Sequence, residues 1–356
     1  MAVVTYKCPN CDGGLIFDAE SQKFHCEFCL SYFTEEELIK AGQAKSEEQI
    51  VDNAENTNSE DSQEAGEDFE GVVYTCPSCG AEVVVDSTKA ASQCCFCHNP
   101  VVISGRLDGK FKPDCVIPFA IDRDEAIETF FKWFKKKWFV PKNFFSKKQL
   151  SKISGVYFPY WVGDCDSQAE INATGTKIRT WRKGDIKYTE TSTYSVVRAG
   201  DIKFRDLSKN ALSKANKALA ENVQPFDFSD VKNVNMAYLS GFEAEKRDIE
   251  ASELEEQVRN EVLDYSAEVL RGTISGYDGV SLTEKRASIG ISWKYALVPV
   301  WLMTFKSGGK DYFYAMNGQT GNTCGKLPVS RSKLAILFAS LFSCVALYIL
   351  HFGGVF

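Results

Sequence analysis

Apolar residues recur at helical spacing in several parts of the chain. The segment 122–139 has a large apolar or alanine side chain every four positions, at Ala126, Phe130, Phe134 and Trp138, which predicts a helix. Asp122 and Glu125 have the spacing of a capping box, and Pro141 is expected to end the helix. Similar patterns predict further helices at 35–41, 209–221 and 252–271.

Other segments alternate between apolar and polar residues or are rich in β-branched side chains, which predicts strands. These segments are 155–171, 187–204, 288–291, 295–305 and 311–316. Lys183-Gly184-Asp185 is a turn signal between the first two. The motif Pro159-Tyr160-Trp161-Val162 returns as Pro299-Val300-Trp301-Leu302 and is compatible with a duplicated strand. Helices and strands together predict an α+β fold for residues 105–328.

The residues 334–356 are continuously apolar. These 23 residues contain no Asp, Glu, Lys or Arg, and as a helix they would reach about 34 Å, enough for a hydrocarbon core of about 30 Å. The alternative is a buried core helix, but such helices usually keep a polar face. Arg331 and Lys333 directly precede the run, so the positive-inside rule places the preceding residues in the cytoplasm. We expect a single-pass tail anchor in the cytoplasmic membrane.

Acidic and small polar residues dominate the segment 43–72. The net charge of the whole chain is −7, yet residues 47–70 contain ten acidic residues and no basic one, so the rest carries +3. Such a segment buries too little apolar surface to offset its ordering entropy. We expect a disordered acidic linker that lets residues 1–42 reach outward from the rest of the protein.

Eight of the thirteen cysteines form an internal repeat. YKCPNCDGGLIFDAESQKFHCEFC, from Tyr6, aligns without a gap with YTCPSCGAEVVVDSTKAASQCCFC, from Tyr74, at an offset of 68 residues. Each copy has the pattern Cys-x2-Cys-x14-Cys-x2-Cys, in which the loop brings two pairs of thiolates to one ion. The predicted metal ligands are Cys8, Cys11, Cys26 and Cys29 in the first copy and Cys76, Cys79, Cys94 and Cys97 in the second.

Four cysteines per site predict two closed structural Zn²⁺ sites, because no position remains for a catalytic water. Modules this small have little core of their own, so the metal would stabilise them; an iron site or a redox pair is the alternative. His25 and His98 flank the sites and are read as surface or supporting side chains. The N-terminus has no apolar signal stretch, which favours a reducing cytosol over a disulfide scaffold. The remaining cysteines with no ligand spacing are expected to be buried free thiols: Cys115, Cys165, Cys324 and Cys344.

Aromatic and basic residues alternate between Phe130 and Lys148. The favoured interpretation is a helix that packs its aromatic face on a sheet and leaves its lysines in solvent. Contact with an anionic membrane surface or with nucleic acid uses the same residue types and stays open.

Motifs of common enzymes are missing from the sequence. It has no Gly-x4-Gly-Lys-Ser/Thr loop, no His-Glu-x2-His and no Gly-x-Ser-x-Gly. Its three histidines, His25, His98 and His351, lie beside the cysteine pairs or in the apolar run. We therefore expect no catalytic residues and no enzymatic activity.

The paired cysteine modules, the acidic linker, the Val116–Phe119 lead-in, the Gly155–Trp161 strand and the apolar C-terminus resemble a family of zinc-ribbon membrane proteins from Gram-positive bacteria. Its members carry the labels transcription-factor-IIB-type zinc ribbon protein or primosomal replication-restart helicase. The helicase label does not suit this chain, which lacks the phosphate-binding loop. Some similar proteins are associated with phage-shock-protein-A-like and SPFH-domain proteins during envelope stress, so the resemblance implies an adaptor.

The sequence thus predicts five segments: zinc ribbon 1 (1–42), the linker (43–72), zinc ribbon 2 (73–104), an α+β domain with a duplicated motif (105–328) and a transmembrane helix (334–356). The predicted function is a membrane-anchored scaffold that recruits partner proteins. The alternative is a membrane-tethered protein that binds nucleic acid, because zinc ribbons serve both purposes. Nucleic acid is the less favoured partner because Asp12, Asp18, Glu20 and Glu27 make the first ribbon acidic.

Overall fold

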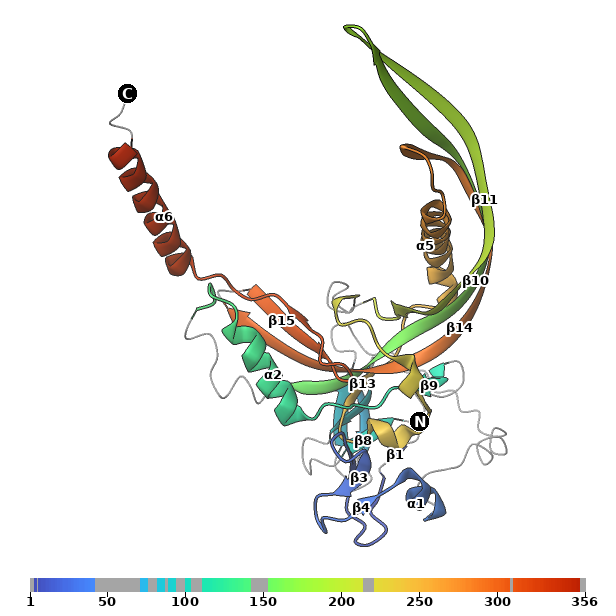
Figure 1. Ribbon diagram of the computed structural model, residues 1–356. Helices are drawn as coiled ribbons and strands as arrows, with labels where there is room; N and C mark the ends of the chain where they lie inside the picture. Colours follow the sequence, from blue (N-terminus) through green and yellow to red (C-terminus); the bar gives the residue numbers. More distant parts are fainter. Residues whose placement is uncertain are drawn as a thin grey trace.

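Three very long strands dominate the structure, a computed structural model (Figure 1). They are β10 (Ser154–Lys183), β11 (Ile186–Asn210) and β14 (Gly279–Ser307). The structure describes residues 3–4, 6–41, 71–75, 82–86, 89–93, 100–103, 111–141, 153–213, 221–307 and 310–352. Helices and strands are mixed throughout these residues, so the predicted α+β class is confirmed.

β10 is the central strand of a curved arm that projects from the body of the molecule (Figure 1). It pairs antiparallel with β11 on one edge and with β14 on the other. The turn between β10 and β11 consists of Gly184 and Asp185 and joins Lys183 to Ile186. Gly184 has a φ of 62°, a left-handed conformation that glycine adopts without strain. The predicted turn at this position is therefore confirmed.

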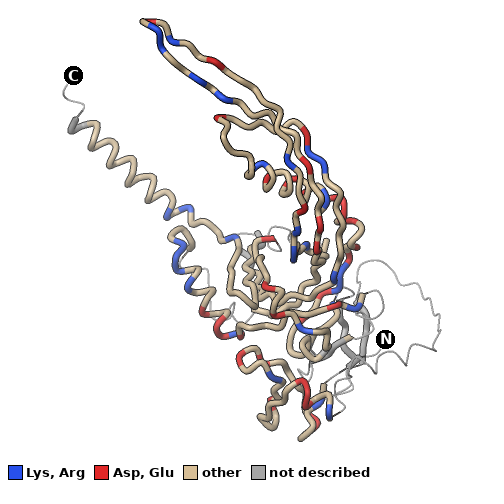
Figure 2. The backbone as a smooth tube through the Cα atoms, turned by 45° about the vertical axis from the view of Figure 1, so that its right-hand side comes forward, with Lys and Arg blue, Asp and Glu red and all other residues tan. Residues whose placement is uncertain are grey.

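Helix α5 (Ala251–Gly272) lies along the concave side of the arm (Figures 1 and 2). Its buried residues Val258 and Val262 form a cluster with Cys165 of β10. Further along, Ala267 and Leu270 form a second cluster with residues of the same strand. The helix predicted at 252–271 is thus confirmed, and Val258, Val262, Ala267 and Leu270 form the face that covers the sheet.

The body repeats one order of elements, strand–helix–long strand–strand. The first copy is β9 (Cys115–Val116), α2 (Arg123–Lys135), β10 and β11, and the second is β13 (Glu243–Glu245), α5, β14 and β15 (Lys310–Asn317). β10 and β14 pair about the residue pair Phe158 and Val298. Each long strand also pairs in parallel with the short strand of the other copy, β10 with β13 and β14 with β9. The two copies are therefore related by an approximate twofold axis and are interlocked.

Equivalent hydrogen bonds recur in the two copies. The indole of Trp161 donates to the Ile249 carbonyl at 2.9 Å, and the indole of Trp301 donates to the Ile121 carbonyl at 3.0 Å. The same correspondence holds for backbone hydrogen bonds at the strand ends. Ala211 N donates to Pro159 O at 3.0 Å, and the equivalent bond of the other copy runs from Gly318 N to Pro299 O at 2.8 Å. Likewise, Ile249 N donates to Ala211 O at 3.1 Å, and Ile121 N donates to Gly318 O at 3.0 Å. The echo between the motifs at 159–162 and 299–302 thus corresponds to a repeated structure.

The core of the body consists of aromatic rings between these copies. Phe119 stacks on Phe242 with ring centres 4.2 Å apart, and it contacts Tyr157 and Trp301 at 5.1 and 5.0 Å. Under α2, Phe130 is fully buried and meets Tyr314 edge-on at 4.6 Å. β16 (Thr323–Gly325) pairs with β15 and ends the sheet beside α6 (Arg331–Phe352).

Three predicted boundaries were wrong. The strands predicted at 288–291 and 295–305 are one strand, because residues 292–294 continue the ladder opposite Val162–Asp164. Lys209 and Asn210, predicted to begin a helix, belong to β11 and pair with Trp161 and Tyr160; most of that predicted helix lies outside the described residues. Gly71 and Val72, assigned to the linker, begin β5 (Gly71–Thr75).

Helix α2 also ends earlier than expected. Asp122 caps it as predicted, accepting from Glu125 N at 2.7 Å, but the last helical residue is Lys135. Trp138 falls in the following turn and is 84% exposed rather than part of the apolar face. Pro141 restricts the backbone of Val140 alone, so α2 ends earlier than the proline requires. The turn that follows is held by Ser330 and Lys333, whose N–H groups donate to the carbonyls of Phe139, Trp138 and Val140.

A cramped glycine in β10 provides a test of the body's packing. A Cβ on Gly155 would lie 2.5 Å from Phe242 Cδ1 and 3.1 Å from Phe119 Cζ. Gly155→Ala should therefore lower the free energy of unfolding by about 1–3 kcal/mol. Gly290→Ala in β14 is the control, since its Cβ meets nothing within 4 Å, and its effect should stay within about 0.5 kcal/mol. Denaturant unfolding of the full chain in detergent measures both; equal effects would contradict this packing.

Candidate metal centre and C-terminal apolar helix

The first cysteine module is a small three-stranded sheet followed by a short helix. It comprises β2 (Leu15–Asp18), β3 (Lys23–Cys26), β4 (Tyr32–Phe33) and α1 (Glu35–Lys40). Thr34 and Glu37 form a capping box at the start of α1, which confirms the short helix predicted at 35–41. One cysteine pair precedes β2, and the other begins at the end of β3.

The two cysteine pairs lie in turns of the same construction. In the first, Asp12 N donates to Cys8 O at 2.9 Å and Cys8 N donates to Gly13 O at 2.7 Å. The second turn repeats both bonds eighteen residues later, from Leu30 N to Cys26 O (2.8 Å) and from Cys26 N to Ser31 O (3.0 Å). The residue after each pair has a positive φ, 59° at Asp12 and 58° at Leu30. This shared turn directs both thiols of each pair to the same side.

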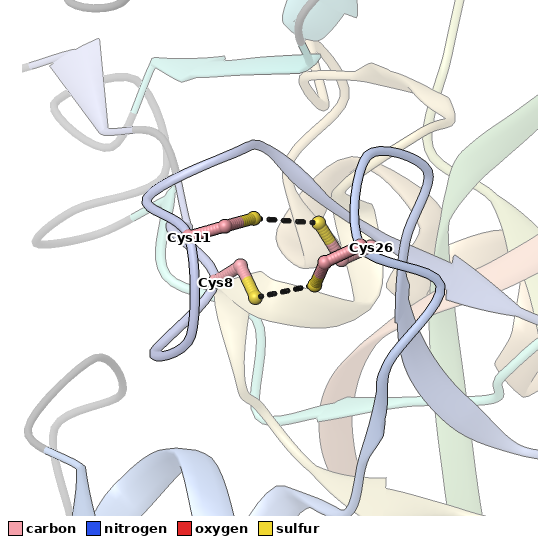
Figure 3. Close-up of side chains that lie close together, drawn as sticks. Cys8, Cys11 and Cys26 are labelled. Carbon is pink, nitrogen blue, oxygen red and sulfur yellow. Dashed lines mark hydrogen bonds between the residues drawn. The ribbon is translucent and has the colours of Figure 1, made fainter.

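The four sulfur atoms converge on one point. Cys8 Sγ lies 3.5 Å from Cys29 Sγ, and Cys11 Sγ lies 3.5 Å from Cys26 Sγ. All four lie within 4.8 Å of one another (Figure 3). Sulfurs bound to a tetrahedral ion at about 2.3 Å would lie about 3.8 Å apart. The arrangement therefore fits a metal ion with four sulfur ligands.

The surroundings of the cysteines combine burial with hydrogen bonding. Cys8 and Cys26 are fully buried, whereas Cys11 and Cys29 face the exterior. Burial raises the pKa of the Cys8 thiol. The hydrogen bond between Cys29 Sγ and Ser31 Oγ (3.3 Å), together with the Ser31 backbone, lowers the pKa of the Cys29 thiol to about 6. Cysteines bind metal ions as thiolates. A cation bound at this site would therefore displace the protons from the four sulfurs.

The module is docked on the body rather than free to reach outward. Phe17 and Phe24 contact the ring of Tyr238 at 5.1 and 5.6 Å. Tyr238 belongs to the short helix η6 (Met236–Leu239) of the body. Phe17 N donates to Ser240 O at 3.0 Å, and Gln22 Nε2 donates to Phe119 O at 2.8 Å. These contacts correct the expectation that the linker lets the first module range away from the body.

Glu35 of α1 adds a second set of hydrogen bonds between the cysteine module and the body. Its carboxylate accepts from Asn235 Nδ2 at 2.7 Å and from the Tyr238 hydroxyl at 2.9 Å. Neither the residues of η6 nor Asn235 carried a signal in the sequence. A polar residue one position before a short helix, with its partner two hundred positions away, is invisible to local pattern analysis.

The predicted ligands of the second copy, Cys76, Cys79, Cys94 and Cys97, lie outside the described residues. The strands around them are described: β5 pairs with β6 (Glu82–Asp86), and β7 (Lys89–Gln93) pairs with β8 (Pro100–Ile103). β7 also pairs with β13 of the body, and β8 pairs with β1 (Val3–Val4). Both ends of the N-terminal region are therefore joined to the main sheet.

Among the described residues, His25 and the cysteines without ligand spacing are not part of the four-sulfur cluster. His25 stacks on Tyr32, with ring centres 4.5 Å apart. Cys165 is buried as predicted, but Cys115 and Cys324 are only half-buried and Cys344 is exposed on α6. Burial raises the pKa of both half-buried thiols to about 11, so they remain protonated at neutral pH.

Helix α6 is apolar on every side, and none of its residues with a described burial is buried. It contains a 19-residue candidate membrane span, Arg331–Ile349, none of which is buried within the protein. Phe338 and Phe342 are each 74% exposed. A core helix of a soluble protein would bury such residues. By length and composition α6 can therefore cross a membrane. The last four residues of the predicted span, 353–356, lie outside the described residues.

The described residues define an α+β protein with an N-terminal four-cysteine cluster and a C-terminal apolar helix. "Uncharacterized protein YdjG" of Bacillus subtilis (strain 168) is 30% identical to the chain over 359 residues, a match that covers 99% of this chain and all of that protein. The chain belongs to the same family as YdjG. No family model matches the chain, and no solved structure matches it.

The docking of the module predicts a specific effect of Glu35. Glu35→Ala removes the acceptor for Asn235 and Tyr238 and should weaken docking by about 1–3 kcal/mol, the usual worth of hydrogen bonds to a charged group. Backbone amides of β2 and η6 should then exchange hydrogen faster, while the metal content stays unchanged because Glu35 is not a ligand. Glu36→Ala, on the exposed side of the same helical turn, is the matched control. Unchanged exchange in Glu35→Ala would show that the carboxylate is not what holds the module.

Proposed function

We propose that the protein is a non-enzymatic adaptor, anchored in the cytoplasmic membrane by α6, that holds partner proteins at the membrane through its zinc-bearing N-terminal region. The observation that carries this proposal is the exposed apolar surface of α6: none of its 19-residue candidate span is buried in the protein, and its length matches the thickness of a bilayer. Arg331 and Lys333 at its start favour a cytoplasmic location for the rest of the chain.

The arrangement of the molecule supports an adaptor. The cysteine module lies at the opposite end of the molecule from α6 (Figures 1 and 2). With α6 in the bilayer, the module would face away from the membrane and be accessible to cytoplasmic proteins. Because the module is docked on the body, it would present a fixed surface rather than a tethered one. The resemblance to zinc-ribbon membrane proteins favours phage-shock-protein-A-like or SPFH-domain proteins as partners.

We assign zinc as the metal of the first site and extend the assignment to the second copy. Four thiolates with the spacing described above are a typical structural Zn²⁺ site, with no open position for chemistry. The second site would use Cys76, Cys79, Cys94 and Cys97, which repeat the first set at a constant offset of 68 residues. Two zinc ions per chain would then stabilise the N-terminal region.

Metal analysis tests the two sites separately. The purified full chain should contain two zinc ions, and Cys8→Ser should remove about one of them while the second remains. Cys165→Ser, which changes a buried thiol that packs against α5, should keep both. An iron–sulfur absorption band, or one zinc ion in the wild-type protein, would contradict the assignment.

Fractionation and affinity purification test the adaptor. Deleting 334–356 should move the protein to the soluble fraction with its fold intact. The full chain, purified from membranes of cells under envelope stress, should retain a protein partner. The truncated chain should still bind this partner, because it keeps the N-terminal region, but should no longer hold it at the membrane. In parallel, residues 1–333 should bind DNA and RNA weakly at about 150 mM salt. Micromolar or tighter nucleic-acid binding that falls steeply with salt, without a protein partner, would favour the nucleic-acid alternative.

A further inference from the structure

The end of α2 and the start of α6 border a cavity that is open to solvent. Its volume is about 470 Å³, within the range of small-molecule sites. It is lined from one side by residues that follow or end α2 and from the other by the segment that leads into α6, principally Trp133, Lys136, Lys137, Trp138, Leu327 and Val329. The lining combines apolar surface with two cationic side chains and contains no acidic residue.

Hydrogen bonds fix this cavity at the first turn of α6. Lys333 Nζ donates to the carbonyls of Trp138 and Val140 at 3.1 and 2.6 Å. Ser330 N donates to the Phe139 carbonyl at 2.6 Å. The turn after α2 is therefore held against the residues where α6 begins. Since the apolar part of α6 starts at Leu334, the cavity lies at the level where the helix would enter the bilayer.

The aromatic and basic stretch that began at Phe130 divides into two parts. Phe130 belongs to the core, and Trp133 is half-buried beside it. Beyond the end of α2, Lys136, Lys137 and Trp138 are all exposed. Lys137 Nζ lies 5.3 Å from the Trp133 ring centre, which orients this ammonium group at the cavity. The interpretation that this stretch packs its aromatic side chains on the sheet thus holds for α2, but not for the turn that follows α2.

Positive charge gathers around the cavity. Figure 2 shows lysines and arginines along the end of α2 and in the first turn of α6, with the acidic residues of α2 at its other end. Exposed tryptophan beside lysine is the usual composition at the boundary between a bilayer and water. Basic residues near an anionic leaflet each contribute about 1 kcal/mol of attraction.

We propose that this cavity binds the headgroup of an anionic glycerophospholipid drawn from the bilayer around α6. Lys136 and Lys137 neutralise the phosphate, and Trp138 with Val329 covers the glycerol and the first acyl carbons. The inference rests on the proposed membrane location of α6. It adds that the anchor selects its lipid neighbours and that the bound lipid fixes the body relative to the membrane surface.

Native mass spectrometry of the full chain in detergent, with phosphatidylglycerol and phosphatidylcholine as competing probes, tests the site. The wild-type protein should retain phosphatidylglycerol preferentially. Lys136→Gln with Lys137→Gln should lower this preference at least about tenfold, because each lysine is worth about fivefold. The control is Lys112→Gln with Lys232→Gln. Both control lysines are exposed, and they lie beside β9 and in β12 (Lys232–Asn233), at the end of the body away from α6 (Figure 1). They should change the preference by less than about twofold.

Two outcomes would overturn the inference. The first is an unchanged preference in the cavity variant; Trp138→Ala, which should also weaken lipid retention, checks the same site without altering its charge. The second is displacement of the lipid by inorganic phosphate or glycerol phosphate at equal concentration, which would assign the cavity to a soluble anion. Carbonate extraction of the same membranes separates this result from the proposed function. Protein that resists extraction but shows no lipid preference refutes only the lipid site, whereas extractable protein refutes the membrane anchor and the lipid site with it.

Discussion

The antiparallel pairing of β10 with β14 is the contact on which the rest of the molecule depends. It runs from Ser154 opposite Leu302 to Thr176 opposite Gly279. Around its centre, at Phe158 and Val298, each strand also accepts the short parallel strand of the other copy. Neither copy of the repeat could keep its sheet alone, because its short strand pairs with the other copy. The two copies must therefore form together, and contacts so distant in sequence imply slow folding.

Every functional element is attached to this pairing through one or two further contacts. The cysteine module meets η6 and Phe119, and Phe119 stacks against Phe242 at the centre of the body. At the other end, β15 and β16 continue the sheet from β14 to the first turn of α6. A metal site of four sulfurs needs only its local turns to form, as the two matched cysteine turns show. Its position relative to the membrane, in contrast, depends on the whole sheet.

The sequence predicted those features whose signal is local. The hairpin at Gly184, helix α5 and the convergence of Cys8, Cys11, Cys26 and Cys29 all follow from spacing within one segment. The length of the arm could not be predicted, because beyond Ile171 the inward-facing positions hold the small residues Ala173 and Gly175 and then Lys177, so the apolar side of the alternation fades. Pairing with β11 and β14 decides the structure there. Trp138 and the docking of the module were missed for the same reason, since both depend on residues far away in the sequence.

The geometry of the arm places a constraint on any membrane-bound arrangement. The tip of the β10–β11 hairpin and the C-terminal end of α6 project toward the same end of the molecule in both views (Figures 1 and 2). Beyond Thr176 the hairpin has no third strand from β14. It exposes Trp181 and Tyr188, whose rings stack at 5.6 Å. In both views the hairpin tip reaches as far in this direction as the C-terminal end of α6, so α6 can cross a bilayer only if it tilts relative to the arm, while the cysteine module extends the other way. The main sheet would then lie between the cysteine module and the membrane.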